Sequence, residues 1–72
     1  MSDVEKMKEV EDRIDSLLKD LRASKLTKSK IVKYYQGLDM TYDEFLERAE
    51  HSIIENLNEE GSTKMEKILG EF

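Results

Sequence analysis

The fold is decided by residues 26–57, LTKSKIVKYYQGLDMTYDEFLERAEHSIIENL, which contain two complete helix starts. Thr27 and Thr41 each place a hydroxyl where it can accept a hydrogen bond from the backbone of a following helix. Thr41 is followed three residues later by Glu44, which is the pattern of a capping box, and an apolar residue precedes each cap as in a hydrophobic staple. We therefore predict that helices begin directly after Thr27 and Thr41.

The spacing of apolar residues predicts an all-α fold for the whole chain, taken as a single helical domain, residues 1–72. Gly37 and Gly61 are expected to end the second and third helices, and Ser62 or Thr63 to start the fourth. The architecture is then a small helical bundle of three helices plus a short C-terminal fourth. The predicted helices cover about residues 3–23, 28–36, 42–58 and 64–70.

The second and third predicted helices are joined by only residues 38–40. Such a short joint predicts that they form an angular, helix-turn-helix-like pair. The predicted core consists of the residues on the inner faces of the first three helices and the joint: Val10, Ile14, Leu17, Leu21, Ile31, Tyr35, Leu38, Phe45, Leu46, Ala49, Ile53 and Leu57.

The first predicted helix is longer than its neighbours need as a packing partner, because its length is about 30 Å. Its apolar stripe begins at Val4 and Met7, so we expect these two residues to face another protein chain. The same stripe follows a heptad pattern interrupted by Glu11 at a core position. A homodimer through this helix therefore stays an open alternative.

The sequence offers little material for catalysis, because it holds no Cys and a single His. Glu47, His51 and Glu55 share one helix face, but a di-iron site in a helical bundle needs Glu three residues before His, and Arg48 stands there. We therefore expect a non-enzymatic protein with no catalytic residue, no metal site and no cofactor.

The formal charge of −5 is unevenly distributed along the chain. Residues 34–60 contain eight acidic residues and one Arg, whereas residues 19–33 contain six basic residues and one Asp. This basic segment is the candidate surface for nucleic-acid phosphates or for an acidic partner. Its basic residues are Lys19, Arg22, Lys25, Lys28, Lys30 and Lys33.

The last predicted helix presents one apolar face, made of Met65, Ile68, Leu69 and Phe72. This face can either cover the core or dock in a groove of a partner protein. Together with Val4 and Met7, it makes up the candidate protein-binding surface.

The favoured function is a small protein-protein interaction module, an accessory or inhibitory subunit of a larger complex whose partner the sequence does not identify. The alternative is a nucleic-acid-associated regulator, helix-turn-helix-like and dimeric, that binds phosphate through residues 19–33. The N-terminus contains no basic segment followed by an apolar run, and no apolar run is as long as a membrane span. We therefore expect a cytoplasmic protein that does not associate with membranes.

Overall fold

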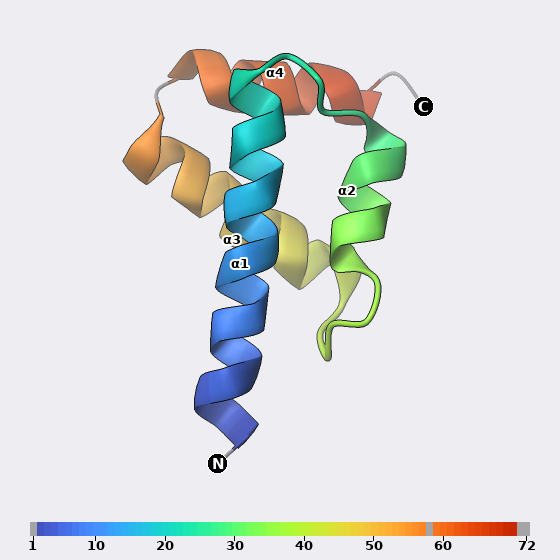
Figure 1. Cartoon of the computed structure of the whole chain (residues 1–72). Helices are drawn as coiled ribbons and strands as arrows, with labels where there is room; N and C mark the ends of the chain where they lie inside the picture. Colours follow the sequence, from blue (N-terminus) through green and yellow to red (C-terminus); the bar gives the residue numbers. More distant parts are fainter. Residues whose placement is uncertain (1, 58, 71–72) are drawn as a thin grey trace.

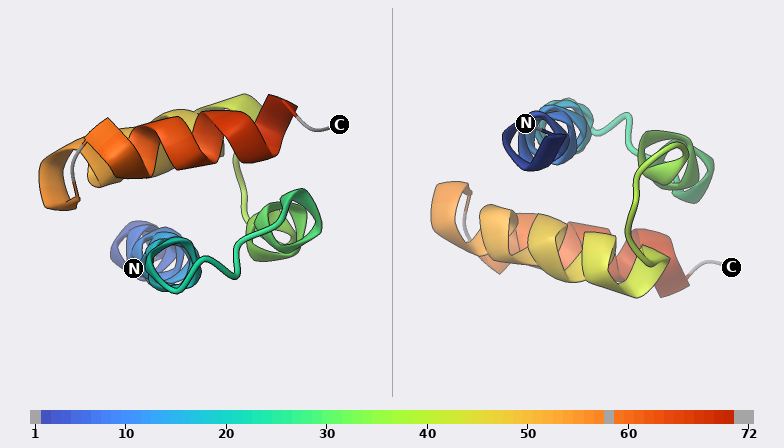
Figure 2. Two further views of the ribbon diagram at one scale, coloured as in Figure 1. Left: turned by 90° about the horizontal axis from the view of Figure 1, so that it is seen from above. Right: turned by 90° about the horizontal axis from the view of Figure 1, so that it is seen from below.

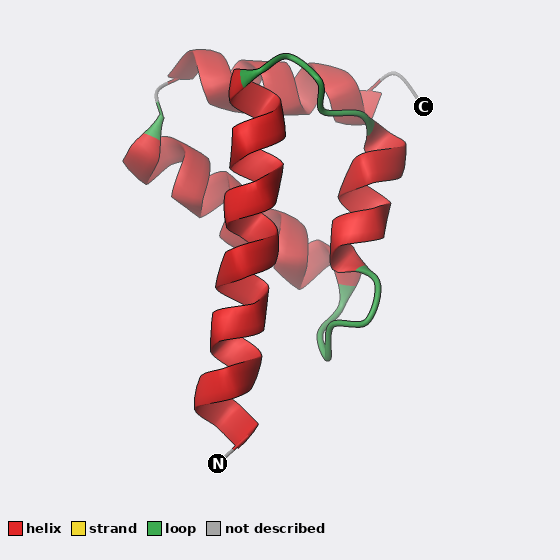
Figure 3. Cartoon of the chain, in the orientation of Figure 1, coloured by secondary structure: helices red, strands yellow, loops and turns green. Residues whose placement is uncertain are grey.

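The computed structural model describes residues 2–57 and 59–70, and it confirms the all-helical prediction. These residues form four α-helices and no strand (Figures 1 and 3). Within this described part, no helix combines the length and the hydrophobicity needed to cross a membrane. The helices are α1 (Ser2–Arg22), α2 (Lys28–Tyr35), α3 (Tyr42–Asn56) and α4 (Glu59–Gly70).

The four helices are arranged as two layers of two helices each (Figure 2). In one layer α1 and α2 lie side by side and run in opposite directions, and in the other layer α3 and α4 do the same. Helix α1 packs against all three other helices. The apolar core therefore lies between the layers, with α1 as its central element.

Both predicted N-caps are confirmed. The Thr27 hydroxyl accepts a hydrogen bond from the backbone N–H of Lys30 at 3.3 Å, and the Thr41 hydroxyl accepts one from Glu44 at 3.2 Å. Each bond satisfies a donor in the first helical turn that has no partner within the helix. The starts of α2 and α3 follow directly from these two threonines.

Helix α1 ends in a Schellman motif, in which backbone donors beyond the helix return to its last carbonyls. The N–H of Lys25 donates to the carbonyl of Asp20 at 2.8 Å, and the N–H of Ser24 donates to Leu21 at 3.1 Å. Ser24 has a φ of 57°, the left-handed conformation that glycine usually adopts at this position. The chain thereby turns sharply toward α2.

The predicted boundary at Gly61 is wrong, because α4 already starts at Glu59 and contains this glycine. Gly61 is buried, and a Cβ there would lie 3.1 Å from both Ile53 Cγ2 and Leu57 Cδ1. The glycine thus permits close approach of α4 to the end of α3 and does not terminate a helix. With twelve residues against eight, α4 is longer than α2 and is not the short final helix that was predicted.

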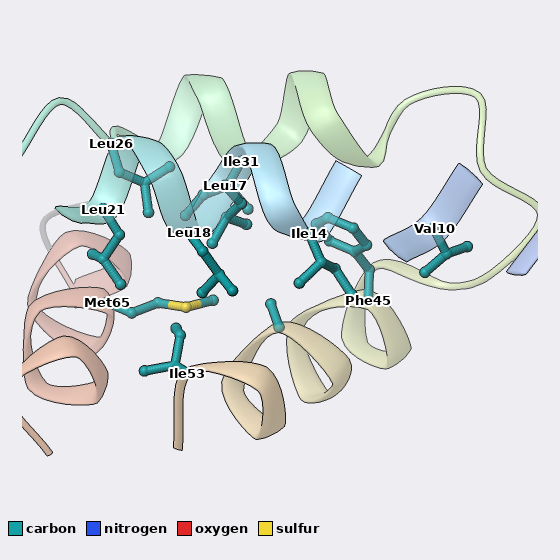
Figure 4. Packing of buried hydrophobic residues seen from close by; sticks show 11 residues of the cluster. Val10, Ile14, Leu17, Leu18, Leu21, Leu26, Ile31, Phe45, Ile53 and Met65 are labelled. Atoms are coloured by element: carbon teal, nitrogen blue, oxygen red, sulfur yellow. The ribbon is translucent and has the colours of Figure 1, made fainter. Parts of the chain in front are cut away.

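The core agrees with the prediction at its centre and extends further at one end (Figure 4). Of the predicted core residues, Tyr35, Leu38, Leu46 and Leu57 are only partly buried but pack against the core, and all the others are buried. Leu18, Leu26 and Met65 are buried as well, although they were not predicted to be. The buried set is Val10, Ile14, Leu17, Leu18, Leu21, Leu26, Ile31, Phe45, Ala49, Ile53 and Met65.

Candidate protein-interaction surfaces

The N-terminal end of α1 extends beyond the rest of the molecule (Figure 1). Val4 and Met7 lie there with 77% and 54% of their surface exposed, whereas Val10, one turn further on, is only 7% exposed. The apolar stripe of α1 therefore continues from the core into solvent. Exposed apolar patches can mark interaction sites, so this end of α1 is a candidate binding surface.

An open groove of about 460 Å³ lies beside this exposed end and is called the α1 groove here. Its apolar part combines Met7 and Val10 of α1 with Leu38 and Met40 of the connection between α2 and α3. Charged residues of both signs form its edges. The lining residues are Lys6, Met7, Glu9, Val10, Gly37, Leu38, Asp39, Met40 and Arg48.

Arg13 fixes the wall of the groove that the α2–α3 connection provides. Its guanidinium donates hydrogen bonds to the carbonyls of Tyr34 at 3.2 Å and Gln36 at 3.3 Å, at the C-terminal end of α2. A cation at this end of a helix satisfies free carbonyls and offsets the negative end of the helix dipole. The connection then turns at Gly37, whose φ of 87° favours glycine.

One ion pair joins the two walls of the α1 groove, between Lys6 Nζ and Asp39 Oδ2 at 3.0 Å. Both side chains are more than half exposed. A pair this exposed contributes little to stability, about 0–1 kcal/mol, because water and salt screen it. An incoming partner can therefore displace it at low cost.

The predicted basic segment is partly used for contacts within the chain. Lys30 Nζ lies 3.6 Å from Asp20, and the hydroxyl of Tyr34 donates a hydrogen bond to the same carboxylate. This hydrogen bond lowers the pKa of Asp20 and raises the pKa of Tyr34. Arg22 Nη2 donates to the carbonyl of Asn56 at the end of α3, at 3.4 Å. Lys30 and Arg22 therefore hold helices together.

The other basic residues of this segment lie on different elements. Lys19 is exposed on α1, Lys25 is exposed between α1 and α2, and Lys33 is exposed near the far end of α2. Lys28 is half-buried in the first turn of α2. The sequence block is therefore spread over three elements.

Two lysines from elsewhere in the sequence join the end of this segment. Lys64 Nζ of α4 donates to the hydroxyl of Ser24 at 3.4 Å, across a separation of 40 residues. Lys64, Lys67 and Ser24 line one hollow of about 240 Å³. Sequence reasoning missed these two residues, because the packing of α4 across the end of α1 brings them there. Their spacing of three residues, which places both on one helix face, was the available signal.

The C-terminal apolar face requires a correction. Met65 is only 3% exposed, and Figure 4 shows it beside Leu18 and Ile53 in the core. Ile68 and Leu69 are half-buried against the same core, and Phe72 lies outside the described residues. Of the two alternatives for this face, these residues therefore support the one in which it covers the core, and Met65 is not an exposed anchor for a partner.

His51 Nε2 lies 3.1 Å from the Glu55 carboxylate, one turn along α3, and both side chains are largely exposed. Among the side chains that the structure describes, in residues 4–57 and 59–70, no three His, Cys, Asp or Glu are grouped closely enough to hold a metal ion.

Comparisons with models of protein families, with curated proteins and with solved structures gave no match.

Proposed function

We propose that this protein is a small, non-enzymatic protein-protein interaction module, an accessory or inhibitory subunit of a larger complex, that docks through the α1 groove and the adjoining Val4. The observation that carries the proposal is the exposed continuation of the core stripe at Val4 and Met7, beside the apolar groove wall of Leu38 and Met40.

The proposed occupant is an amphipathic helix of another protein. The exposed N-terminal end of α1 and the α1 groove beside it offer a surface against which a second helix can pack its apolar face. Burying an apolar side chain of this size contributes about 1.5–3 kcal/mol, so Val4 and Met7 can supply a useful part of the affinity. Lys6, Glu9 and Arg48 at the edges suit a helix with charges of both signs.

The test compares variants of the full chain in capture and crosslinking experiments. The double variant Val4→Ser/Met7→Ser removes the apolar surface, and Ile54→Ser is a matched control, because Ile54 is 63% exposed on α3 outside the α1 groove. A partner that depends on the groove is lost with the double variant and retained with the control. A photo-crosslinking amino acid at position 7 should capture the same partner, and one at position 54 should not.

Equal capture by both variants, or crosslinks from position 54 alone, would contradict the proposal. Sedimentation velocity of the purified chain tests a further outcome, in which a second copy of this chain, and not another protein, occupies the α1 groove. A dimer that Val4→Ser/Met7→Ser dissociates would assign this surface to self-association through α1.

The alternative of a nucleic-acid-associated regulator has weaker support. A helix-turn-helix-like pairing of α2 with α3 belongs to this alternative, yet α2 lies in the layer of α1, and α3 in the layer of α4. Lys30 is paired with Asp20, and α3 carries Asp43 and Glu44 in its first turn, where phosphates would be repelled. Titration with a 20-base-pair duplex at low salt tests it, and binding that weakens steeply with added salt would favour it over protein docking.

A further inference from the structure

A second hollow lies at the opposite end of α1 from the α1 groove. It is called the lysine pocket here and has a volume of about 240 Å³. Residues 21–26 form one side of it, from the last turn of α1 to the residue before the cap of α2, and α4 forms the other. The lining residues are Leu21, Ser24, Leu26, Lys64, Lys67 and Ile68.

The lysine pocket combines an apolar floor with a cationic edge. Leu21 and Leu26 are buried and Ile68 is half-buried, so the floor is hydrocarbon. Lys64 and Lys67 are exposed at the edge, and no carboxylate is among the lining residues. Lys64 donates a hydrogen bond to the neutral hydroxyl of Ser24.

The neighbouring surface adds positive charge. Lys25 is exposed next to Ser24, and Arg22 lines an adjoining hollow of about 120 Å³ together with Lys64. Glu60 lies in that adjoining hollow and not in the lysine pocket. Lys64 and Lys67 thus line the apolar depression, and Lys25 and Arg22 add positive charge on neighbouring segments of the chain.

We infer that the lysine pocket binds an acidic amphipathic segment of a partner protein. An apolar side chain of that segment enters the depression over Leu21, Leu26 and Ile68, and flanking Asp or Glu residues pair with Lys64 and Lys67. Complementary charge steers the encounter and selects the partner, while the apolar side chain supplies burial. This inference goes beyond the proposed function, because the surface and the chemistry of the occupant differ from those of the α1 groove.

An acidic peptide suits the pocket better than a nucleic acid does. The lining residues include no aromatic side chain on which a base could stack. Glu60 and Glu66 lie on the same helix as the two lysines, and the whole chain carries a net charge of −5, which opposes a long polyanion. A short segment with few carboxylates avoids most of this repulsion and fills the apolar floor, which phosphates leave uncovered.

The test is selection of random 12-residue peptides displayed on phage against the full chain, followed by titration of the selected peptides. The expected peptides contain Asp or Glu on both sides of a Leu, Ile, Met or Phe. Lys64→Glu/Lys67→Glu should weaken their binding at least about tenfold at low salt, because attraction at two contacts becomes repulsion. Lys64→Gln/Lys67→Gln should give an intermediate loss.

Lys19→Glu/Lys33→Glu is the matched control, because it changes the net charge equally and neither residue lines the pocket. Circular dichroism of each variant establishes that the helices persist. Val4→Ser/Met7→Ser should bind the selected peptides normally, so failure of the proposed function at the α1 groove is distinguishable from failure here.

Selected peptides without acidic enrichment, or equal binding by the Lys64→Glu/Lys67→Glu variant and the control, would overturn the inference. The same titrations are made with a 12-nucleotide single strand. Binding of that strand in place of peptides, with loss in Lys64→Glu/Lys67→Glu, would also overturn it and assign the pocket to nucleic acid.

Discussion

The two halves of α1 share one apolar pattern but lie in different surroundings. In the second half Ile14, Leu17 and Leu21 are buried between the layers, whereas Val4 and Met7 in the first half are mostly exposed. The difference arises because α3 and α4 lie across the later turns of α1, and its N-terminal end extends past them (Figure 1). Apolar periodicity therefore predicts which face of a helix is apolar but not how much of that face the fold covers.

Polar contacts show the same contrast along α1. Asp20 and Arg22 connect its second half to α2 and α3, and Arg13 connects its middle to the end of α2. In the first half, Lys6 makes an exposed ion pair with Asp39 of the connection between α2 and α3. The second half thus stabilises the fold, while the turns before Val10 keep an apolar surface, at Val4 and Met7, that the fold leaves mostly exposed.

The two halves should differ most in how far a truncated apolar side chain lowers the free energy of unfolding. Leu17 is fully buried, so Leu17→Ala should lower the free energy of unfolding by about 2–5 kcal/mol through lost burial and an added cavity. Met7→Ala should change it by less than about 0.5 kcal/mol, because Met7 is mostly exposed. Urea denaturation followed by circular dichroism measures both values. Similar losses for the two variants would show that the first half is covered in solution.

A smaller effect is expected at Arg13, which lies between the halves. Arg13→Ala removes the guanidinium from the carbonyls of Tyr34 and Gln36 and should lower the free energy of unfolding by about 1 kcal/mol. Hydrogen bonds from a charged group stabilise more than neutral ones, but the Arg13 side chain is partly exposed, which reduces their contribution. Arg13→Lys keeps the charge but not the forked donor, so it should recover only part of the loss.

Amide hydrogen exchange gives a second measure of the Arg13 contact. Faster exchange in Arg13→Ala should be confined to the end of α2 and residues 36–40, the wall of the α1 groove. Uniformly faster exchange over the whole chain would indicate general destabilisation and contradict the role assigned to Arg13.

At the C-terminal end of α1, one substitution is expected to stabilise the protein. Ser24 adopts a φ of 57°, which glycine adopts without the steric cost that a Cβ causes. Ser24→Gly should therefore raise the free energy of unfolding by about 0.5–1 kcal/mol, because the left-handed penalty for a residue with a Cβ is removed. Ser24→Ala keeps the Cβ and loses the hydroxyl contact with Lys64, so it should not stabilise. Thermal unfolding of the two variants side by side tests this.

Local patterns account for what the sequence predicted correctly. The hydroxyls of Thr27 and Thr41 bond to backbone only three residues away, so their roles depend on short-range geometry alone. The buried residues of α2 and α3 follow from helical spacing in the same way. These features therefore required no knowledge of how the helices pack.

Packing between distant segments accounts for what the sequence did not predict. Gly61 has the sequence appearance of a helix stop, yet its position is decided by the close approach of Ile53 and Leu57. Met65 is buried because α4 packs on α1 and α3, and Lys64 meets Ser24 for the same reason. The lysine pocket depends on that packing, whereas the unpacked end of α1 was predicted from the length of the helix and its apolar stripe at Val4 and Met7.

The smallest effect expected in the second half of α1 is a dependence of stability on pH. The hydrogen bond from Tyr34 and the charge of Lys30 hold the pKa of Asp20 below its ordinary value of 3.8. A carboxyl group with a lowered pKa in the folded state stabilises the fold above its unfolded pKa, and this contribution is lost as the pH falls through the folded pKa. The thermal unfolding temperature of the wild type should therefore be higher than that of Asp20→Asn near pH 6, and this difference in temperature should shrink below about pH 4.

Two further variants separate the causes of the pKa shift. Tyr34→Phe should reduce the difference in unfolding temperature more than Lys30→Gln does, because the hydrogen bond is the larger cause of the shift. A difference that stays constant from pH 6 to below pH 3 would mean that the ionised form of Asp20 is not what joins α1 to α2.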